Sequence, residues 1–259
     1  MKIQQIVDYL DNVFHPELQE DYDNSGFLLG NGTSDYRGAL VALDLTPEVI
    51  DEAVQQGLNF IVTHHPFIFR GLRRVTDGNE PGRMVQALIR HDIAVYAAHT
   101  NLDNLAWGVN GILSEKLGLY NCRILKPMDT HQDAGAGMVG ELAEEMPTEK
   151  FLRQVKETLG LATVRYAGHG TTVRRVAVCG GAGGFLIEEA HAAGADIYLT
   201  ADLKYHDFQR CTDRMVVADI GHYESEQFAK EIIFHTISEK FSNFAVRISE
   251  RQQSLVRYI

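Results

Sequence analysis

Short apolar runs alternate with amphipathic stretches along the chain, which is the pattern of α/β layers built around a sheet. The clearest amphipathic stretch lies at the N-terminus, where apolar residues recur at helical spacing and predict one buried helix face. These residues are Ile3, Ile6, Val7, Leu10, Val13 and Phe14. A strand is predicted at 39–43. A second helix is predicted from Pro47 onward, because Thr46 suits the cap and Gly57 suits the turn after the last residue.

Two further predicted strands end in residues that carry chemistry. One runs to His64 and is followed by His65 and Pro66, and the other spans 93–98 and leads into the segment from His99 to Asp103. A helix around 83–91 connects them. Both chemically rich loops therefore follow strands.

The second half of the chain repeats the alternation after a segment rich in Gly, Asp and Pro at 126–137. It predicts a helix capped by Thr148, a helix ending at Ala193, and a long closing helix from Gly221 to about Phe241. Predicted strands lie at 138–142, 163–166, 174–179, 196–200 and 215–220. We expect a discontinuous first domain of residues 1–125 plus 215–259, with a second α/β domain at 126–214, because the C-terminal segment must return to the first domain if its ligands are to join the others.

Composition limits the environment and the partners. A net charge of −11 argues against broad binding to nucleic acids or anionic membranes. No segment approaches 18 consecutive apolar residues. Cys122, Cys179 and Cys211 are odd in number and widely spaced, so the sequence indicates neither a disulfide framework nor a thiolate zinc site. A reducing, cytoplasmic setting is expected.

Three clusters of potential metal ligands follow predicted strands, at the edge where α/β sheets gather their ligands. They are His64 with His65, His99 with Asp103, and His222 with Glu226. His222 and Glu226 are four residues apart at a helix start and can share one face. Adjacent residues of an extended segment point to opposite sides, so His64 and His65 are expected to bind different ions, one per imidazole. A carboxylate, Asp103 or Glu226, would then bridge two metals.

Such a centre favours hydrolysis. Two divalent cations and two carboxylates leave a positive charge that attracts a small anion, and water on a catalytic metal ionises at a pH of roughly 7. His99 is expected to contact the substrate or to support the ligands, and to move protons as a catalytic residue, although a ligand role is open.

Two further features are candidates for substrate binding. The run from Gly180 to Gly184 follows a strand, so the amides of Gly181 and Gly183 could receive an anion, although a tight turn explains the glycines equally well. Lys204 and His206 follow the strand at 196–200 and could contact a substrate anion, with a solvated helix start as the alternative.

A series of motifs carries a family resemblance. In order along the chain they are Asp23-Asn-Ser-Gly26, Thr63-His-His-Pro66, His99-Thr-Asn-Leu-Asp103, Cys179-Gly-Gly-Ala-Gly-Gly184, Tyr198-Leu-Thr200, Lys204-Tyr-His206 and Gly221-His-Tyr-Glu-Ser-Glu226. Together they resemble the GTP cyclohydrolase I type 2 homologue family, the Ngg-interacting-factor-three-like proteins. Only about ten residues separate Lys126 from Gly137, which indicates a short form without the insertion domain that many members carry.

The resemblance implies a dinuclear metal centre between two α/β domains, in subunits that form a toroidal homohexamer. It places the metal ligands on His64, His65, Asp103, His222 and Glu226, with Glu226 bridging. Where many members have Trp and Gly, this chain has Tyr22 and Ala201.

The function implied is that of a GTP cyclohydrolase, in which a metal-bound hydroxide attacks C8 and opens the imidazole ring, with His99 or Glu226 moving protons. A metal-dependent phosphoesterase or nucleotidase is the alternative enzyme. A non-catalytic metal-binding scaffold is the alternative of a different class. The N/O ligand set admits Zn, Mn, Fe or Ni.

Overall fold

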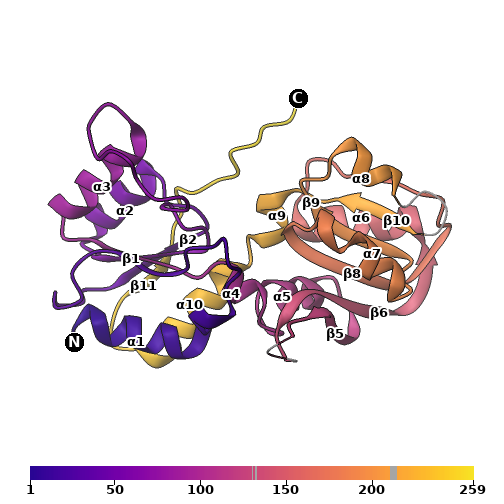
Figure 1. Cartoon of the computed structure of the whole chain (residues 1–259), viewed down its shortest axis with the longest axis horizontal. Coiled ribbons are helices and arrows are strands. Elements are labelled where there is room, and N and C mark those ends of the chain that lie inside the picture. Colours follow the sequence, from indigo (N-terminus) through magenta and orange to yellow (C-terminus); the bar gives the residue numbers. More distant parts are fainter. Residues whose placement is uncertain (130, 132, 211–214) are drawn as a thin grey trace. The chain divides into compact units, whose positions relative to one another are not determined.

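The structure, a computed structural model, describes residues 1–129, 131, 133–210 and 215–259. These residues fall into two compact units, each with its own sheet (Figure 1). Unit 1 comprises Met1–Leu102 and Ala229–Gln253, and unit 2 comprises Asp103–Phe228 and Ser254–Ile259. Within the described ranges, no helix has both the length and the apolar character needed to cross a membrane.

The sheet of unit 1 has the strand order β1-β4-β3-β2-β11. Its strands are β1 (Gly26–Leu29), β2 (Ala39–Ala42), β3 (Phe60–Thr63), β4 (Ala94–Ala97) and β11 (Val246–Ile248). The last four strands are parallel, whereas β1 runs antiparallel to β4 with Gly26 opposite Ala97. The carboxyl ends of four strands and the start of β1 therefore meet at one edge.

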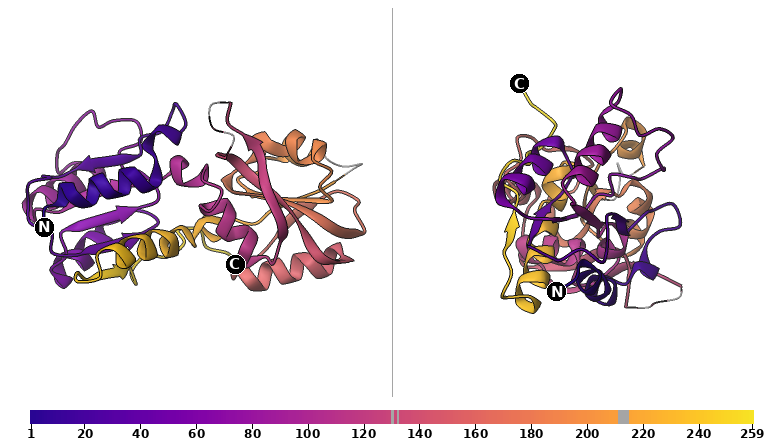
Figure 2. Two further views of the ribbon diagram at one scale, coloured as in Figure 1. Left: turned by 90° about the horizontal axis from the view of Figure 1, so that it is seen from below. Right: turned by 90° about the vertical axis from the view of Figure 1, so that its left-hand side faces the viewer.

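Helices cover both faces of this sheet. They are α1 (Ile3–Phe14), α2 (Pro47–Gln56), α3 (Glu80–Arg90) and α10 (Ala229–Lys240), with α4 (Thr100–Asp103) as a single turn and a 3₁₀ turn at Pro16–Leu18. α2 and α3 lie on one face, and α1 and α10 lie on the other (Figures 1 and 2). Alternate strand residues such as Leu40 and Ile61 pack beneath α2 and α3. The predicted cap of α2 is confirmed, since Thr46 Oγ1 accepts the Val49 N–H at 3.3 Å and Gly57 has a φ of 69°.

The sheet of unit 2 has the strand order β5-β6-β8-β9-β10-β7. Its strands are β5 (Tyr120–Pro127), β6 (Gly135–Pro147), β7 (Arg165–Ala167), β8 (Thr172–Ala182), β9 (Ile197–Ala201) and β10 (Val216–Asp219). β8, β9 and β10 are parallel neighbours, and the other pairs are antiparallel. The carboxyl ends of the three parallel strands therefore meet at one edge of this sheet.

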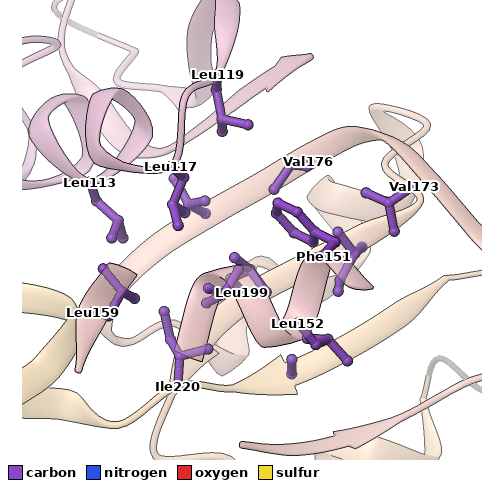
Figure 3. Packing of buried hydrophobic residues seen from close by; sticks show 14 of the residues in the cluster. Leu113, Leu117, Leu119, Phe151, Leu152, Leu159, Val173, Val176, Leu199 and Ile220 are labelled. Carbon is purple, nitrogen blue, oxygen red and sulfur yellow. The ribbon is translucent and has the colours of Figure 1, made fainter. Parts of the chain in front are cut away.

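Unit 2 also packs helices on both faces. They are α5 (Val109–Lys116), α6 (Thr148–Leu159), α7 (Ile187–Ala192), α8 (Tyr205–Gln209) and α9 (His222–Glu226), with a 3₁₀ turn at Gly184–Leu186. Figure 3 shows one core layer, in which Phe151 and Leu152 of α6 and Leu113 of α5 pack against Val176 and Leu199 of the sheet. Cys179 and Tyr198 face the opposite layer, together with Leu186 and Ile187. The predicted α/β class with two helix-flanked sheets is confirmed.

The division into units differs from the predicted domains 1–125 plus 215–259 and 126–214. The chain changes unit at Leu102/Asp103 and again at Phe228/Ala229. The reason is strand pairing: β5 pairs with β6, and β10 pairs with β9, so both strands complete the sheet of unit 2.

Two local predictions also need correction, and three strands were missed. The closing helix is two helices, α9 and α10, and between them Gln227 donates its side-chain amide to the carbonyl oxygens of Leu159 and Glu224. Thr148 is the first residue of α6 rather than its cap, and its hydroxyl donates to the Gly170 carbonyl oxygen at 2.7 Å. Strands β1, β5 and β11 were not predicted.

Candidate metal-binding residues

Three imidazoles gather at the edge of unit 1 where the carboxyl ends of its parallel strands meet. His64 and His65 follow β3, and His99 follows β4, so the parallel pairing of these strands brings the residues together. The ring centroids lie 5.0 Å apart for His64 and His65, and 5.4 Å apart for each of the two pairs with His99. The clustering of these side chains at a strand end agrees with the sequence prediction.

From the sequence, the side chains of His64 and His65 were expected to point to opposite sides. In the structure they do not. The chain leaves the extended conformation after Thr63, whose hydroxyl donates to the His65 carbonyl oxygen at 2.8 Å. Rings on opposite sides of a strand could not have centroids 5.0 Å apart. The extended-strand argument for one ion per imidazole therefore fails, and the number of ions must rest on the whole ligand set.

Each imidazole of this cluster has its Nδ1 atom beside an oxygen acceptor. His64 Nδ1 donates to the Ala98 carbonyl oxygen at 2.7 Å, and His65 Nδ1 lies 2.7 Å from Asp44 Oδ1. His99 Nδ1 lies 2.7 Å from Asp23 Oδ1. A carbonyl or carboxylate oxygen can only accept, so Nδ1 carries the proton and Nε2 carries the lone pair of the neutral ring. This arrangement is typical of histidines that bind metal through Nε2.

Asp23 is the most heavily hydrogen-bonded of these oxygen acceptors, and its side chain has no exposed surface. Its carboxylate accepts hydrogen bonds from His99, from the hydroxyl of Ser25 at 2.8 Å, and from both the hydroxyl and the backbone N–H of Thr100. Burial raises the pKa of Asp23, but the hydrogen bonds from His99 and Thr100 outweigh it and hold the pKa well below its usual range. Asp23 therefore stays ionised and fixes the His99 ring.

Unit 2 contributes a histidine and a carboxylate on α9. His222 Nε2 lies 3.0 Å from Glu226 Oε2, as the spacing of four residues predicts. His222 Nδ1 lies 2.8 Å from Asp202 Oδ2, so this histidine repeats the arrangement found in unit 1. Asp202 directly follows β9 and has a φ of 56°, in the left-handed region that Asp adopts more readily than most residues.

The glycines at the end of β8 make room for Glu226. A Cβ atom built on Gly181 would lie 2.1 Å from Glu226 Oε1, and Gly181 has a φ of 62°. The N–H of Gly180 donates to Asn110 Oδ1 at 2.9 Å, and the N–H of Gly181 donates to Ser225 Oγ at 3.0 Å. Both amides are thus engaged within the protein. This geometry favours the tight-packing interpretation of the glycine run over a phosphate cradle.

Gly183 has a similar packing role. A Cβ atom on this residue would lie 2.3 Å from Thr200 Oγ1 and 2.5 Å from the Tyr198 hydroxyl, and that hydroxyl donates to the Gly183 carbonyl oxygen at 2.7 Å. The role of Gly181 and Gly183 as substrate contacts stays a prediction.

The charges of Asp103 and Glu226 both act on the buried thiol of Cys179. The Asp103 carbonyl oxygen accepts the side-chain amide of Asn110 at 3.1 Å, which fixes its backbone in unit 2. Burial, with the charges of Asp103 and Glu226, raises the pKa of Cys179 to about 12. The charges of both predicted carboxylate ligands therefore act on the same buried thiol.

Cys179 is expected to resist alkylation in the metal-free native protein. At about pH 8, a thiol with this pKa is ionised to about one part in ten thousand, and only the thiolate reacts. Iodoacetamide labelling followed by peptide mass spectrometry should modify the exposed Cys122 and spare Cys179, whereas both should react after denaturation in urea. Equal labelling of both residues in the native protein would contradict this assignment. Cys211 lies outside the described residues.

Lys204 and His206 lie on exposed positions at α8. The N–H of Lys204 donates to Asp207 Oδ2 at 2.8 Å, and His206 Nδ1 lies 3.0 Å from Gln209 Oε1. This geometry matches a solvated helix start. Their contact with a substrate stays a prediction.

Sequence reasoning did not select the acidic residues that hold the imidazoles. Asp44 and Asp202 each come shortly after a parallel strand, and Asp23 precedes the strand that pairs with β4. Such residues could be found in a sequence by looking for an acidic residue at the same sheet edge as a candidate histidine ligand.

The donor atoms fit a divalent cation. Imidazole nitrogens with defined tautomers and carboxylate oxygens are the ligands of zinc, manganese, iron and nickel sites. Among the described residues, unit 1 supplies such ligands in His64 and His65, and unit 2 supplies one in Glu226. Fold and site together define an α/β protein with a candidate metal-binding centre.

Comparison with known proteins assigns the family. Residues 1–254 match the model of Duf34/NIF3 (NGG1p interacting factor 3), and the chain belongs to this family. It is 35% identical over 230 residues to a protein of Clostridium perfringens named GTP cyclohydrolase 1 type 2 homolog, covering 87% of each chain. A protein of Lactococcus lactis with the same name is 34% identical and covers 92% of this chain and 91% of its own.

Solved structures show the same fold. The crystal structure of a Staphylococcus aureus hypothetical protein superposes with a TM-score of 0.91 at 28% identity, covering 100% of this chain and 99% of that one. A Bacillus cereus protein related to NIF3 superposes with a TM-score of 0.90 at 24% identity, with the same coverage. The predicted family resemblance is confirmed.

Proposed function

We propose that this protein is a divalent-metal-dependent hydrolase that acts on a purine nucleotide. The observation that carries the proposal is the shared arrangement of His64, His65, His99 and His222, each with Nδ1 beside an oxygen acceptor. A histidine buried in a protein core needs only a hydrogen-bond partner, whichever ring nitrogen makes the bond. In this repeated arrangement, Nδ1 of each ring is bonded and the lone pair of Nε2 is available to a metal ion. The name of the relatives, GTP cyclohydrolase 1 type 2 homolog, supports GTP as the substrate.

The proposed ligands are His64, His65, Asp103, His222 and Glu226, and the proposed number of ions is two. Five protein ligands exceed what one tetrahedral ion takes, and catalytic ions keep a position open for water. Bound there, the cations would lower the pKa of water and stabilise negative charge developing on the substrate. Metal analysis of protein reloaded under inert gas should find two ions per chain. A plateau at one ion would contradict the dinuclear proposal.

His99 is proposed to transfer a proton at Nε2. Its Nδ1 is held by Asp23, which fixes the ring and stabilises the imidazolium that forms when Nε2 takes a proton. The His99 ring centroid lies 5.4 Å from those of His64 and His65, which supports a role for His99 beside two proposed ligands and outside the ligand set.

The substrate proposal follows from charge and family. A centre with two divalent ions and two carboxylates stays positive, so it attracts a phosphate-bearing molecule to a chain whose net charge is −11. For GTP, we propose hydrolytic opening of the imidazole ring at C8. Self-association as a homohexamer belongs to the same proposal, and light scattering of the metal-loaded protein would test it against six times the 29.0 kDa chain mass.

The deciding experiment follows GTP by proton NMR with metal-free protein and with protein loaded with Zn²⁺, Mn²⁺, Fe²⁺ or Ni²⁺. Ring opening removes the C8 proton signal and produces a formyl or formate signal. We expect the C8 signal to disappear only when metal is bound. In the His99→Ala variant, the C8 signal should persist even with metal bound. Release of phosphate with the C8 signal intact would instead identify a nucleotidase. No turnover of any nucleotide or phosphodiester, with metal bound, would leave a non-catalytic scaffold.

A further inference from the structure

The C-terminal segment of unit 1 runs directly into the edge that carries the histidines. β11 is parallel to β2 with Ile248 opposite Val41, and the Ser249 N–H continues the ladder by donating to the Val41 carbonyl oxygen at 2.8 Å. Because parallel strands end at the same edge, the residues after Ile248 reach the level of Asp44, which follows β2. The segment from Ser249 to Gln252 is therefore part of the site edge.

A buried carboxylate fixes this segment. Glu52 of α2 is 3% exposed, and its carboxylate accepts a hydrogen bond from the Ser249 hydroxyl. It also accepts the backbone N–H of Glu250 at 3.2 Å. Buried carboxylates are rare unless their oxygens are satisfied, so this contact strongly determines the path of the chain past α2.

Gln252 uses both ends of its amide at the site edge and is 7% exposed. Its Oε1 accepts the backbone N–H of Leu43, and its Nε2 donates to Asp44 Oδ2 at 2.9 Å. The other oxygen of the same carboxylate, Asp44 Oδ1, lies 2.7 Å from His65 Nδ1. One carboxylate thus joins the C-terminal glutamine to a candidate metal ligand.

We propose that Gln252 is a positioning residue for the metal centre, acting on His65 through Asp44. Without Gln252 the Asp44 carboxylate, whose side chain is one-third exposed, loses one hydrogen-bond donor and holds the His65 ring less firmly. With Gln252 in place, both carboxylate oxygens are engaged and the ring keeps Nε2 directed for binding. The inference rests on the proposed function only in taking His65 as a metal ligand.

The test uses Gln252→Met, which keeps the side-chain length and removes both hydrogen bonds. Its matched control is Gln253→Met, because Gln253 is the neighbouring glutamine and is exposed. Titration of metal-free protein with Zn²⁺ should show affinity lowered by roughly 3- to 10-fold in Gln252→Met, below the 10- to 100-fold typical of a direct partner of a ligand. Gln253→Met should bind as the wild type does. If Gln252→Met is poorly folded by circular dichroism, Gln252→Asn replaces it.

A double-mutant cycle separates positioning from general stability. If Gln252 acts through Asp44, then Asp44→Ala and the double variant Asp44→Ala with Gln252→Met should bind Zn²⁺ equally weakly. Additive losses would overturn the proposal, since Gln252 would then act by another route.

A second measurement needs no metal at all. In the metal-free protein, ¹⁵N NMR of the His65 ring should show the Nδ1–H tautomer in the wild type and a mixture of tautomers in Gln252→Met. An unchanged ring together with unchanged Zn²⁺ affinity would overturn the proposal. Failure of the wild type to bind any divalent metal would instead refute the proposed function, while the ring measurement would still decide the role of Gln252.

Discussion

The His65→Ala variant is expected to lose about 100- to 1000-fold in affinity for Zn²⁺. Structural zinc sites bind with roughly 10–16 kcal/mol shared among about four ligands, so one ligand contributes about 2.5–4 kcal/mol. Each 1.4 kcal/mol corresponds to about a factor of ten. His65 has its Nδ1 fixed by Asp44, so its loss also removes a well-oriented donor of the cluster in unit 1.

The matched control is His235→Ala, because His235 is an exposed histidine of α10 in the same unit. Calorimetric titration with Zn²⁺ and metal analysis after dialysis measure the difference, and circular dichroism confirms that both variants are folded. Equal affinities in the two variants would remove His65 from the ligand set. Glu226 is the corresponding proposed ligand in unit 2, and Glu226→Ala should also lower the affinity for Zn²⁺.

The Gly181→Ala variant is expected to destabilise unit 2 by about 2–5 kcal/mol and to weaken metal binding as well. An L-residue in the left-handed backbone region costs roughly 1–2 kcal/mol. Crowding of a packed site costs roughly 1–3 kcal/mol more. Because the added methyl group would lie 2.1 Å from Glu226 Oε1, the carboxylate must move, which couples the loss of stability to the proposed ligand.

Gly160→Ala isolates the backbone contribution. Gly160 has a φ of 68° at the end of α6, close to the 62° of Gly181. Apart from Gly160 and its chain neighbours, no atom of the described residues lies within 4 Å of its added Cβ. Urea unfolding should show the smaller backbone cost alone for Gly160→Ala, with Zn²⁺ affinity unchanged. A Gly181→Ala variant that matches Gly160→Ala in both measurements would show that Glu226 does not depend on the glycine.

Local patterns predicted the regular elements well where one face is apolar or where caps are present. The N-terminal helix and the capped helix α2 were predicted correctly because the apolar spacing and the cap residues that mark them are close together in the sequence. Strands β1 and β11 are four and three residues long, and their pairing with β4 and β2 comes from distant parts of the chain. No local pattern of that length distinguishes a strand from a loop.

The site shows the same limit. Parallel strands bring the residues beyond their carboxyl ends to one sheet edge, so strand ends sufficed to predict the cluster of His64, His65 and His99. The acceptors that fix the rings depend on long-range pairing, as in Asp23 with His99, which no spacing rule reveals. The relative direction of His64 and His65 was predicted wrongly because the chain bends after Thr63, where a side-chain hydrogen bond holds the turn.

The return of α10 and β11 to unit 1 has a consequence for synthesis on the ribosome. The sheet of unit 2 has all its described strands once Asp219 has emerged, whereas the sheet of unit 1 waits for Val246–Ile248. Domains that fold during translation do so as their sequence becomes available. The nascent chain therefore completes the sheet of unit 2 first, and the sheet of unit 1 keeps an unpaired edge on β2 until Val246–Ile248 have emerged.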